Sequence, residues 1–529
     1  MPTANKKKPQ KTNVDMDVAT RIFNALDIES KGYIFKETLV SALNDCGILA
    51  DDVRITQTTL GLKKYGDKER ISLSSFRTLV GPHITLIEKA LTGGLVIPDF
   101  KNFTSFIVNL FNRTLQNKQG EISNYIPELA GMHPDRYALS VCTVDGQRFN
   151  IGDYATKYLA RDTAKAFNYC LALKDSDEKT VHDRIGHSPK ENGLDYLMLD
   201  KNGLPHNPLT DAGALAVGSM IGGTNDPEKK LAQVKKLWKN LSGGSTPGFN
   251  EKALASEKKV ADSDRAAAYF MQQKGYFPKG VDVTKQLEFV WQCMALETTT
   301  EAQAVMAATL ANAGVCPSNE HEVLSSKITR DCLSVMFMSG TREYSSEYAF
   351  SIGLPAVSGR SGAVMICVPD VMGIVVWSPR VDACGNSYKG IDFSHKLVER
   401  FNFHNFDSAL RNVKKVDPRL KKNETKMKGV MAVTSAASAG DLDELNRLSA
   451  AGIDLNEGEY DRRTGIHLAA SEGHLDVVKF LVEKGVDINC RDRWGGTPTG
   501  DAKREGHTEV YEFLKKHGGV LNYKSKEIL

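Results

Sequence analysis

Apolar positions recur at two different spacings along the chain, and the change between them separates an N-terminal region from a central one. In residues 17 to about 120 apolar side chains recur every three or four positions, as in the stripe Val18, Ile22, Phe23 and Leu26. That spacing predicts amphipathic helices. From about residue 121 to 410, short apolar runs rich in β-branched residues alternate with helical stretches. The central region is therefore predicted to be α+β, with helices packed against an antiparallel sheet.

Short apolar runs supply the predicted strands of this sheet. Ala138–Val144 ends in Asp145-Gly146 and is followed by Gln147–Ile151, a pattern typical of a β-hairpin. Ala363–Val368 and Gly373–Trp377 are predicted to be buried strands. The helices predicted to cover the sheet are Gln286–Leu296 and Ala302–Ala313.

One further helix carries the residue pair on which the functional argument depends. Tyr158–Leu171 has helical spacing, and we expect a helix that begins near Ala160 and is buried on one face. Asp162 and Lys165 lie one turn apart on that helix. In several acyl-transfer enzymes this spacing is filled by Ser-x-x-Lys, in which the amine takes the proton of the nucleophilic hydroxyl. Here the lysine is present and the hydroxyl is not.

The stretch Asp27–Thr38 has the spacing of a calcium-binding helix–loop–helix, with a glycine at position 6 of the loop. Lys31 occupies position 5 and Thr38 occupies position 12, where the metal site needs an oxygen ligand and a bidentate glutamate. A second loop, around Lys64–Ser75, lacks the ligands altogether. The pattern favours an EF-hand-like helical pair used for packing or assembly over a calcium site.

A 33-residue period appears in the C-terminal part of the chain. Gly440, Gly473 and Gly506 are 33 residues apart, as are Thr464 and Thr497. This period is typical of ankyrin repeats, and residues 431–520 are predicted to hold about two full units and a partial first one. The lysine-rich residues 411–430 are predicted to be a linker. Residues 1–16 are predicted to be a disordered tail, and residues 521–529 a frayed end.

Composition narrows the functional classes. The net charge of +3 is too small to argue for nucleic acid or an anionic membrane surface, and no apolar run is long enough to span a bilayer. Nine scattered cysteines with no Cys-x-x-Cys indicate reduced thiols in an intracellular protein, and no metal site or cofactor is expected. The lysine-rich N-terminus has no apolar core, so the cytoplasm is the expected location, with a mitochondrial one left open.

Long strings in the chain resemble the eukaryotic kidney-type and liver-type glutaminases. They include IPDFKNFTSFI, SVCTVDGQR, PHNPLTDAGA, VMAATLANAGVCP, GLPAVSG and VMGIVVWSP. The resemblance implies a serine-dependent domain of β-lactamase-like α+β fold, preceded by an EF-hand-like helical region and followed by ankyrin repeats. It also implies an amidohydrolase that converts L-glutamine to L-glutamate and ammonia and assembles as dimers and tetramers.

The resemblance places several residues of this chain at the family's active-site positions. Asp162 stands where the nucleophilic serine belongs, and Lys165 stands where the assisting lysine belongs. Tyr125 and Glu257 match the pocket tyrosine and the substrate-binding glutamate. The other pocket positions have changed: Asp211 and Asp264 replace asparagines, Val290 and Arg342 replace tyrosines, and Arg360 replaces a small apolar residue beside the oxyanion.

These replacements predict loss of glutamine hydrolysis. A carboxylate beside Lys165 raises the pKa of the amine, which then stays cationic and cannot act as a base. A carboxylate that attacked an amide would have to form an anhydride, which is far uphill. An ionised aspartate at position 211 can only accept hydrogen bonds and would repel the carboxylate of an amino acid.

Three interpretations remain open from the sequence. In the first, Asp162, Asp211 and Asp264 face Arg342 and Arg360 in a salt-bridged plug, and an inactive glutaminase-like chain acts as an oligomeric scaffold or co-assembles with an active relative. In the second, the chain is an active glutaminase with a rebuilt pocket. In the third, the changed pocket binds a small cationic or amino-acid ligand. His206 is expected to hold its turn by hydrogen bonds, and the ankyrin units are expected to bind a protein partner.

Overall fold

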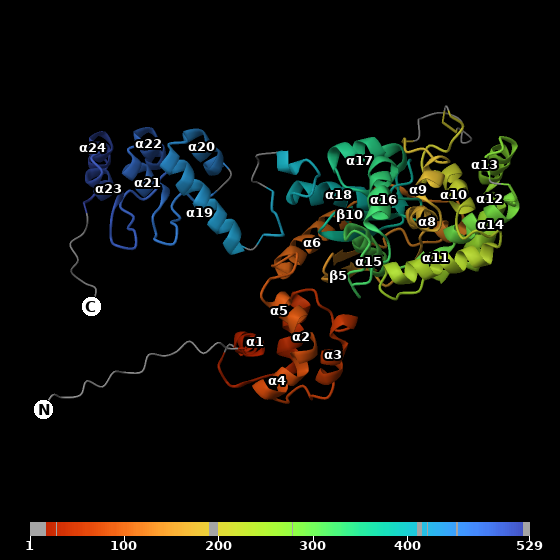
Figure 1. Ribbon diagram of the computed structural model, residues 1–529, viewed down its shortest axis with the longest axis horizontal. Helices are drawn as coiled ribbons and strands as arrows, with labels where there is room; N and C mark the ends of the chain where they lie inside the picture. Colours follow the sequence, from red (N-terminus) through yellow and green to blue (C-terminus); the bar gives the residue numbers. More distant parts are fainter. Residues whose placement is uncertain are drawn as a thin grey trace. The chain divides into compact units, whose positions relative to one another are not determined.

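The computed structural model describes residues 17–27, 29–189, 199–200, 202–277, 279–409, 415–420, 422–450 and 453–521. The predicted N-terminal tail, nearly all of the predicted frayed end and part of the predicted linker lie outside these residues. The chain divides into two compact units, residues 1–398 with 403–405, and residues 399–402 with 406–529 (Figure 1). No described helix is both long enough and apolar enough to cross a membrane.

The first unit opens with a bundle of short helices that has its own apolar core. Its two loops pair through a short antiparallel ladder, Tyr33–Ile34 (β1) with Ile71–Ser72 (β2), as in an EF-hand pair. The Asp27 carboxylate accepts hydrogen bonds from the backbone N–H groups of Lys31 and Gly32, at 2.9 and 2.7 Å. The first acid of the loop therefore orders the loop itself. The helices of this bundle are α1 Val18–Leu26, α2 Lys36–Asp45, α3 Thr56–Leu62, α4 Leu73–Val80 and α5 Ile84–Leu91, and α6 Phe100–Leu115 follows them.

An antiparallel sheet of five strands, in the order β5-β4-β11-β10-β9, forms the centre of the first unit. Every residue of β4, β10 and β11 is buried, and α15 (Thr300–Ala311) packs across all three strands. Gly373 permits this approach, since a Cβ there would lie 2.3 Å from the backbone N of Ala308. The predicted hairpin and buried strands are confirmed. The strands are β4 Ala138–Thr143, β5 Arg148–Gly152, β9 Ala356–Ser358, β10 Ala363–Val368 and β11 Met372–Trp377.

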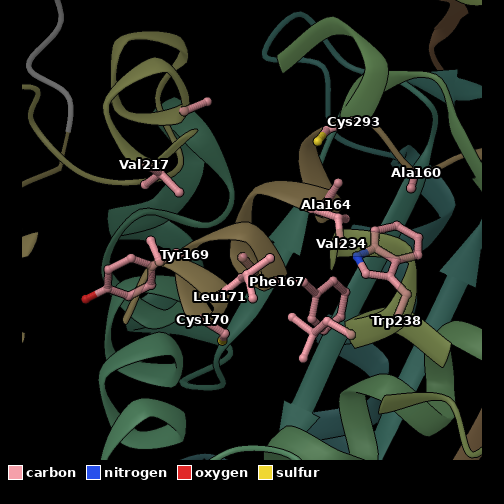
Figure 2. Packing of buried hydrophobic residues seen from close by; sticks show 14 of the residues in the cluster. Ala160, Ala164, Phe167, Tyr169, Cys170, Leu171, Val217, Val234, Trp238 and Cys293 are labelled. Carbon is pink, nitrogen blue, oxygen red and sulfur yellow. The ribbon is translucent and has the colours of Figure 1, made fainter. Parts of the chain in front are cut away.

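The helix that carries Asp162 and Lys165, α8 (Asp162–Asp175), lies between the sheet and a layer of helices (Figures 1 and 2). The prediction of a single buried face is wrong. Residues 163–173 are all buried, because four helices surround the face that the sheet leaves free: α10 (Asp211–Ser219), α11 (Pro227–Leu241), α14 (Val283–Met294) and α16 (Ser326–Ser339). Phe167 of α8 packs edge-on against Trp238 of α11, with ring centroids 5.6 Å apart.

The start of α8 also differs slightly from the prediction. The N–H of Ala160 donates to the carbonyl of Leu296, which continues the pairing of β6 (Tyr158–Leu159) with β8 (Leu296–Thr298). The chain therefore stays extended through Ala160 and enters the helix two residues later than expected.

The remaining helices of this unit are α7 Pro127–Ala130, α9 Glu178–His182, α10 Asp211–Ser219, α11 Pro227–Leu241, α12 Glu251–Val260, α13 Asp262–Gln273, α14 Val283–Met294, α16 Ser326–Ser339, α17 Ser345–Ser351 and α18 Tyr388–Arg400. The remaining strands are β3 Glu121–Ile122, β7 Gly248–Phe249 and β12 Arg380–Val381.

The second unit consists of three helix pairs stacked on one apolar core. They are α19 Lys422–Ala439 with α20 Leu442–Ala450, α21 Gly465–Glu472 with α22 Leu475–Glu483, and α23 Pro498–Arg504 with α24 Thr508–Lys516. The first repeat thus has both helices, where only a partial unit was predicted. Its first helix also begins inside the predicted linker, where the sequence shows no clear helical periodicity. Val433 of this helix belongs to the apolar core that it shares with α21.

Candidate functional site

The first turn of α8 is held in place by an unusual backbone conformation just before it. Arg161 has φ 44° and ψ −115°, outside the regions that L-residues ordinarily adopt. Its side chain is buried and forms a two-pronged ion pair with Glu257 of α12, with Nη1 2.6 Å from Oε2 and Nη2 3.3 Å from Oε1. This pair anchors the strained residue, so that Asp162 becomes the first residue of the helix and faces the cleft.

Asp162, Lys165, Asp211 and Arg342 form one network of charges. Lys165 Nζ donates to Asp162 Oδ1 at 3.0 Å and to Asp211 Oδ1 at 2.7 Å. Arg342 Nη1 lies 3.7 Å from Asp162 Oδ2. Arg342 occupies a left-handed backbone position with φ 60°, which costs a non-glycine residue free energy and is typical of functional sites. The structure therefore brings four of the predicted site residues together.

Arg360 takes part in this network through its backbone. The N–H of Arg360 donates to Asp162 Oδ2 at 3.3 Å, so each carboxylate oxygen of Asp162 accepts one hydrogen bond. The preceding residue, Gly359, leaves room for this approach, because a Cβ there would lie 2.3 Å from Asp162 Oδ2. Gly359 was not singled out in the sequence, although its place beside Arg360 in VSGRSGA was the signal available.

The electrostatics of this network fix the protonation states of its members. Burial by itself would raise the pKa of Asp162, but Lys165 and then Arg342 outweigh it and hold the pKa well below its usual range. Lys165 holds the pKa of Asp211 down to about 2. Burial opposes the charge on Lys165, whereas Asp211 and Asp162 raise the pKa of the amine above its ordinary value. The amine is thus protonated, and both carboxyl groups are ionised, near neutral pH.

Tyr125 and Glu257 lie together beside Arg161, the residue just before α8. The Tyr125 hydroxyl donates to Glu257 Oε1 at 3.1 Å. The guanidinium groups of Arg161 and Arg360 lie 5.1 and 4.9 Å from the centre of the Tyr125 ring, within the range of cation–π attraction. The side chain of Arg360 therefore stacks on Tyr125 instead of facing Asp162, which corrects its predicted place in a plug.

Asp264 is also absent from the charge network. Trp291 Nε1 donates to Asp264 Oδ2 at 2.9 Å, and Asp264 forms no ion pair with any residue that the structure describes. Burial, together with Asp211 and Glu257, raises the pKa of Asp264 to about 6. Trp291 was missed in the sequence, where only its neighbour Val290 was named; Val290 is a buried core residue.

A small polar cleft opens beside the charge network. Its free volume is about 80 Å³, and its lining includes Asp162, Lys165, His206, Asp211, Ser339, Arg342 and Ser358. His206 was predicted to hold its turn by hydrogen bonds; within the described residues its buried Nε2 takes no part in this, because it has no hydrogen-bond partner. The buried side chain lines the cleft instead, because the surrounding turn is closed by backbone hydrogen bonds such as Gly186 N–H to Pro205 O.

The described part of the chain holds no group of three or more histidine, cysteine, aspartate or glutamate side chains placed to bind a metal ion. The charged side chains that line the cleft are Asp162, Asp211, Glu343, Lys165 and Arg342, with hydroxyl and imidazole groups around them.

Comparisons with known proteins agree with this architecture. The glutaminase family profile matches residues 120–406, an EF-hand domain matches residues 18–98, and three copies of the ankyrin repeat match residues 410–525. The liver isoform of mitochondrial glutaminase from Rattus norvegicus is 38% identical over 432 residues, which cover 81% of this chain and 72% of the relative. Putative glutaminase 2 of Caenorhabditis elegans is 36% identical over 465 residues, 84% of this chain and 76% of that protein.

Solved structures resemble the central region. Probable glutaminase ybaS has a TM-score of 0.54 and 27% identity, over 57% of this chain and 97% of the other. A probable glutaminase from Bacillus subtilis, complexed with 6-diazo-5-oxo-L-norleucine, has a TM-score of 0.50 and 26% identity, over 57% of this chain and 94% of the other. With a family profile over more than half its length and relatives matched over most of theirs, this chain belongs to the glutaminase family.

Proposed function

We propose that this member of the glutaminase family does not hydrolyse glutamine and acts as an oligomeric scaffold or regulatory partner in glutamine and glutamate metabolism. The observation that carries the proposal is the double ion pair of Lys165, which lies 3.0 Å from Asp162 and 2.7 Å from Asp211. An amine that serves as a base must first lose its proton, and two ionised carboxylates oppose that loss.

The nucleophile position supports the same conclusion. Asp162 presents a carboxylate, whose attack on an amide would yield an anhydride far above the reactants in free energy. Loss of the nucleophile in a comparable acyl-transfer enzyme lowers turnover by roughly a millionfold. The restricted cleft, about 80 Å³, adds to this argument, because small-molecule sites usually enclose roughly 300–1,000 Å³.

The regulatory role rests on the parts of the family architecture that this chain keeps. Glutaminases of the resembling type assemble as dimers and tetramers, so we expect this chain to form a homo-oligomer or to co-assemble with an active relative. The three ankyrin repeats would supply a surface for a protein partner. We place this role in the cytoplasm; because the rat relative is a mitochondrial glutaminase, mitochondria are the alternative.

A glutamine hydrolysis assay on the purified full-length chain tests the proposal directly. We expect ammonia release no faster than in buffer. Restoring the hydroxyl with Asp162→Ser is expected to leave the chain inactive, because Asp211 and Arg342 still occupy the pocket. Ammonia release at an enzymatic rate that disappears in Lys165→Ala would overturn the proposal.

The second candidate is an active glutaminase with a rebuilt pocket. It is favoured by one observation, the intact hydrogen bond between Tyr125 and Glu257, which are the two unchanged pocket residues. The diazoketone bound by the Bacillus subtilis relative separates the candidates by mass spectrometry. Once its diazo carbon has been protonated, the compound loses nitrogen to an attacking nucleophile and adds mass to a peptide containing residue 162. Because the Asp162 carboxylate can also make this attack, a mass gain supports the active candidate only if glutamine protects against it, and the inactive chain is expected to show no such protection.

A further inference from the structure

Two aromatic side chains are exposed on neighbouring loops of the second unit. Tyr460 lies in the loop between α20 and α21 and is 86% exposed, and Trp494 lies in the loop between α22 and α23 and is 70% exposed. The loops extend from the same side of the helix pairs (Figure 1), and the N–H of Arg493 donates to the carbonyl of Asp461 at 2.7 Å. Tyr460, Arg493 and Trp494 therefore form one continuous surface, which we call the aromatic tip.

Hydrogen bonds and charges within the two loops hold the aromatic tip in place. The Arg493 guanidinium lies 5.2 Å from the centre of the Tyr460 ring, and its Nη1 lies 3.4 Å from Asp461 Oδ1. In the second loop Asp492 Oδ1 accepts a hydrogen bond from the N–H of Trp494 at 2.9 Å. A surface that is ordered before its partner arrives loses less conformational freedom on binding. Tyrosine, tryptophan and arginine are also the side chains that contribute most to protein interfaces.

Net charge does not select the partner of the aromatic tip. Residues 457–463 and 491–494 contain four acidic and four basic side chains, so the two loops carry no net charge. Two of the basic side chains are already paired, Arg463 with Asp501 at 2.9 Å and Arg493 with Asp461. A strongly acidic or strongly basic partner would therefore gain little electrostatic attraction here.

The backbone of the loops does not favour an added strand. The N–H groups of Glu459 and Arg462 donate within the first loop, and those of Asp492 and Gly495 donate within the second. The N–H of Arg493 donates from the second loop to the first. These bonds interrupt the row of free N–H groups that strand addition needs. The side chains of the aromatic tip must therefore provide the recognition.

The polar groups of the two rings are available to a partner as donors. The indole N–H of Trp494 and the hydroxyl of Tyr460 form no hydrogen bond with any residue that the structure describes, and the indole can only donate. A matching partner presents apolar rings and carbonyl acceptors without burying donors of its own. A polyproline II segment does so, because proline has no backbone N–H and the carbonyls of this helix are not bonded internally.

We propose that the aromatic tip binds a proline-rich segment of a protein partner, with proline rings packed on Tyr460 and Trp494. This inference rests on the proposed role of the ankyrin repeats as a surface for a partner. It does not depend on whether the chain hydrolyses glutamine. If the chain released no ammonia and bound no proline-rich peptide, this inference would fail while the proposed loss of hydrolysis would stand.

The test measures binding of a fluorescein-labelled decamer of proline to the full-length chain by fluorescence anisotropy. We expect saturable binding, and at least tenfold weaker binding of a glycine–serine decamer, which has no rings. Absence of saturable binding, or equal binding of the glycine–serine decamer, would overturn the proposal. A glutamate decamer that bound as tightly as the proline decamer would also overturn it, in favour of an acidic partner.

Variants of the chain assign the binding to the aromatic tip. Trp494→Ala and Tyr460→Ala are each expected to weaken binding of the proline decamer at least tenfold, and circular dichroism checks that they fold. Tyr460→Phe, which removes only the hydroxyl, should weaken it severalfold. Met431→Ala changes an exposed side chain elsewhere in the second unit and should have no effect. Unchanged binding in folded Trp494→Ala would contradict the proposal.

Tryptophan fluorescence gives a second measurement on the unmodified chain. Trp238, Trp291 and Trp377 are buried, so acrylamide should quench mainly Trp494. Unlabelled proline decamer at saturation is expected to lower the quenching constant of the accessible tryptophan at least twofold. A quenching constant that stayed the same would show that the peptide does not cover Trp494.

Discussion

Lys165 shows how acidic side chains around a lysine can reverse the role of its amine. With a neutral hydroxyl beside it, a buried amine would tend to lose its proton because burial disfavours charge. With Asp162 at 3.0 Å and Asp211 at 2.7 Å, the same burial strengthens the attraction that keeps the proton in place. The local pair Asp162–Lys165 was readable from the sequence, but the second carboxylate comes from 46 residues away and depends on how α10 packs against α8.

Removal of the Lys165 charge should therefore destabilise the first unit strongly. Lys165→Met leaves Asp162, whose side chain is 14% exposed, without its buried partner, and breaking such a buried pair costs about 3–5 kcal/mol. We expect the lower free energy of unfolding to be measurable by chemical denaturation followed by circular dichroism. Asp162→Asn combined with Lys165→Met should cost less than the sum of the single changes. If the double variant lost as much free energy of unfolding as the two single variants together, the two side chains would not interact.

Asp264 should make the stability of the first unit depend on pH. Its folded pKa of about 6 lies above the ordinary value near 4, so the folded state binds this proton more tightly than the unfolded state. The stabilisation is complete below about pH 4 and is lost as the pH rises to about 6. We expect the melting temperature of the wild type, measured against that of Asp264→Asn, to fall as the pH rises through this window and to stay level above it. A difference between the two melting temperatures that does not change with pH would contradict the prediction.

At the scale of secondary structure, two glycines of the second unit distinguish the cost of left-handed backbone from the cost of close packing. Gly473 and Gly485 both adopt left-handed backbone, with φ of 80° and 79°. A Cβ at Gly473 would lie 2.4 Å from the His507 ring, whose Nε2–H donates to the carbonyl of Ser471, whereas a Cβ at Gly485 meets nothing within 4 Å. The 33-residue period predicted the turn at Gly473, but only the packed repeats show that this turn is crowded and that the turn at Gly485 is not.

These two glycines form a matched pair of substitutions. Gly485→Ala should destabilise the second unit by about 1–2 kcal/mol, the cost of left-handed backbone for a residue with a Cβ. Gly473→Ala should cost clearly more, because the His507 ring must also move. Urea denaturation of the two variants checks the order, and equal losses would mean that the histidine moves freely.

Other elements show where sequence periodicity is sufficient. The hairpin of β4 and β5 was predicted closely, because alternation and the Asp145-Gly146 turn are local signals. The complete burial of α8 was not predicted, because Thr163, Lys165 and Asn168 are polar by sequence and are covered only by distant helices. The same limit applies to α19, whose apolar face is defined by its contact with α21.

At the scale of the whole molecule, the two units each have a hydrophobic core of their own. A unit with its own core can unfold on its own, so stability effects should stay within the unit that is changed. We expect calorimetry of the full chain to show separable transitions, with Lys165→Met lowering one and Gly473→Ala lowering another. A single transition shifted by both variants would show that the units unfold together.

The sequence by itself determined the order of the regions, the family and the loss of the hydroxyl at position 162, because each of these depends on local spacing or on residue identity. Only the tertiary structure decided which of the changed residues act together. It joined Asp162, Lys165, Asp211 and Arg342, turned the side chain of Arg360 onto Tyr125 and paired Asp264 with Trp291. The physical reason is that ion pairs and hydrogen bonds act over a few ångströms, and the groups that meet here are separated by up to 198 residues along the chain.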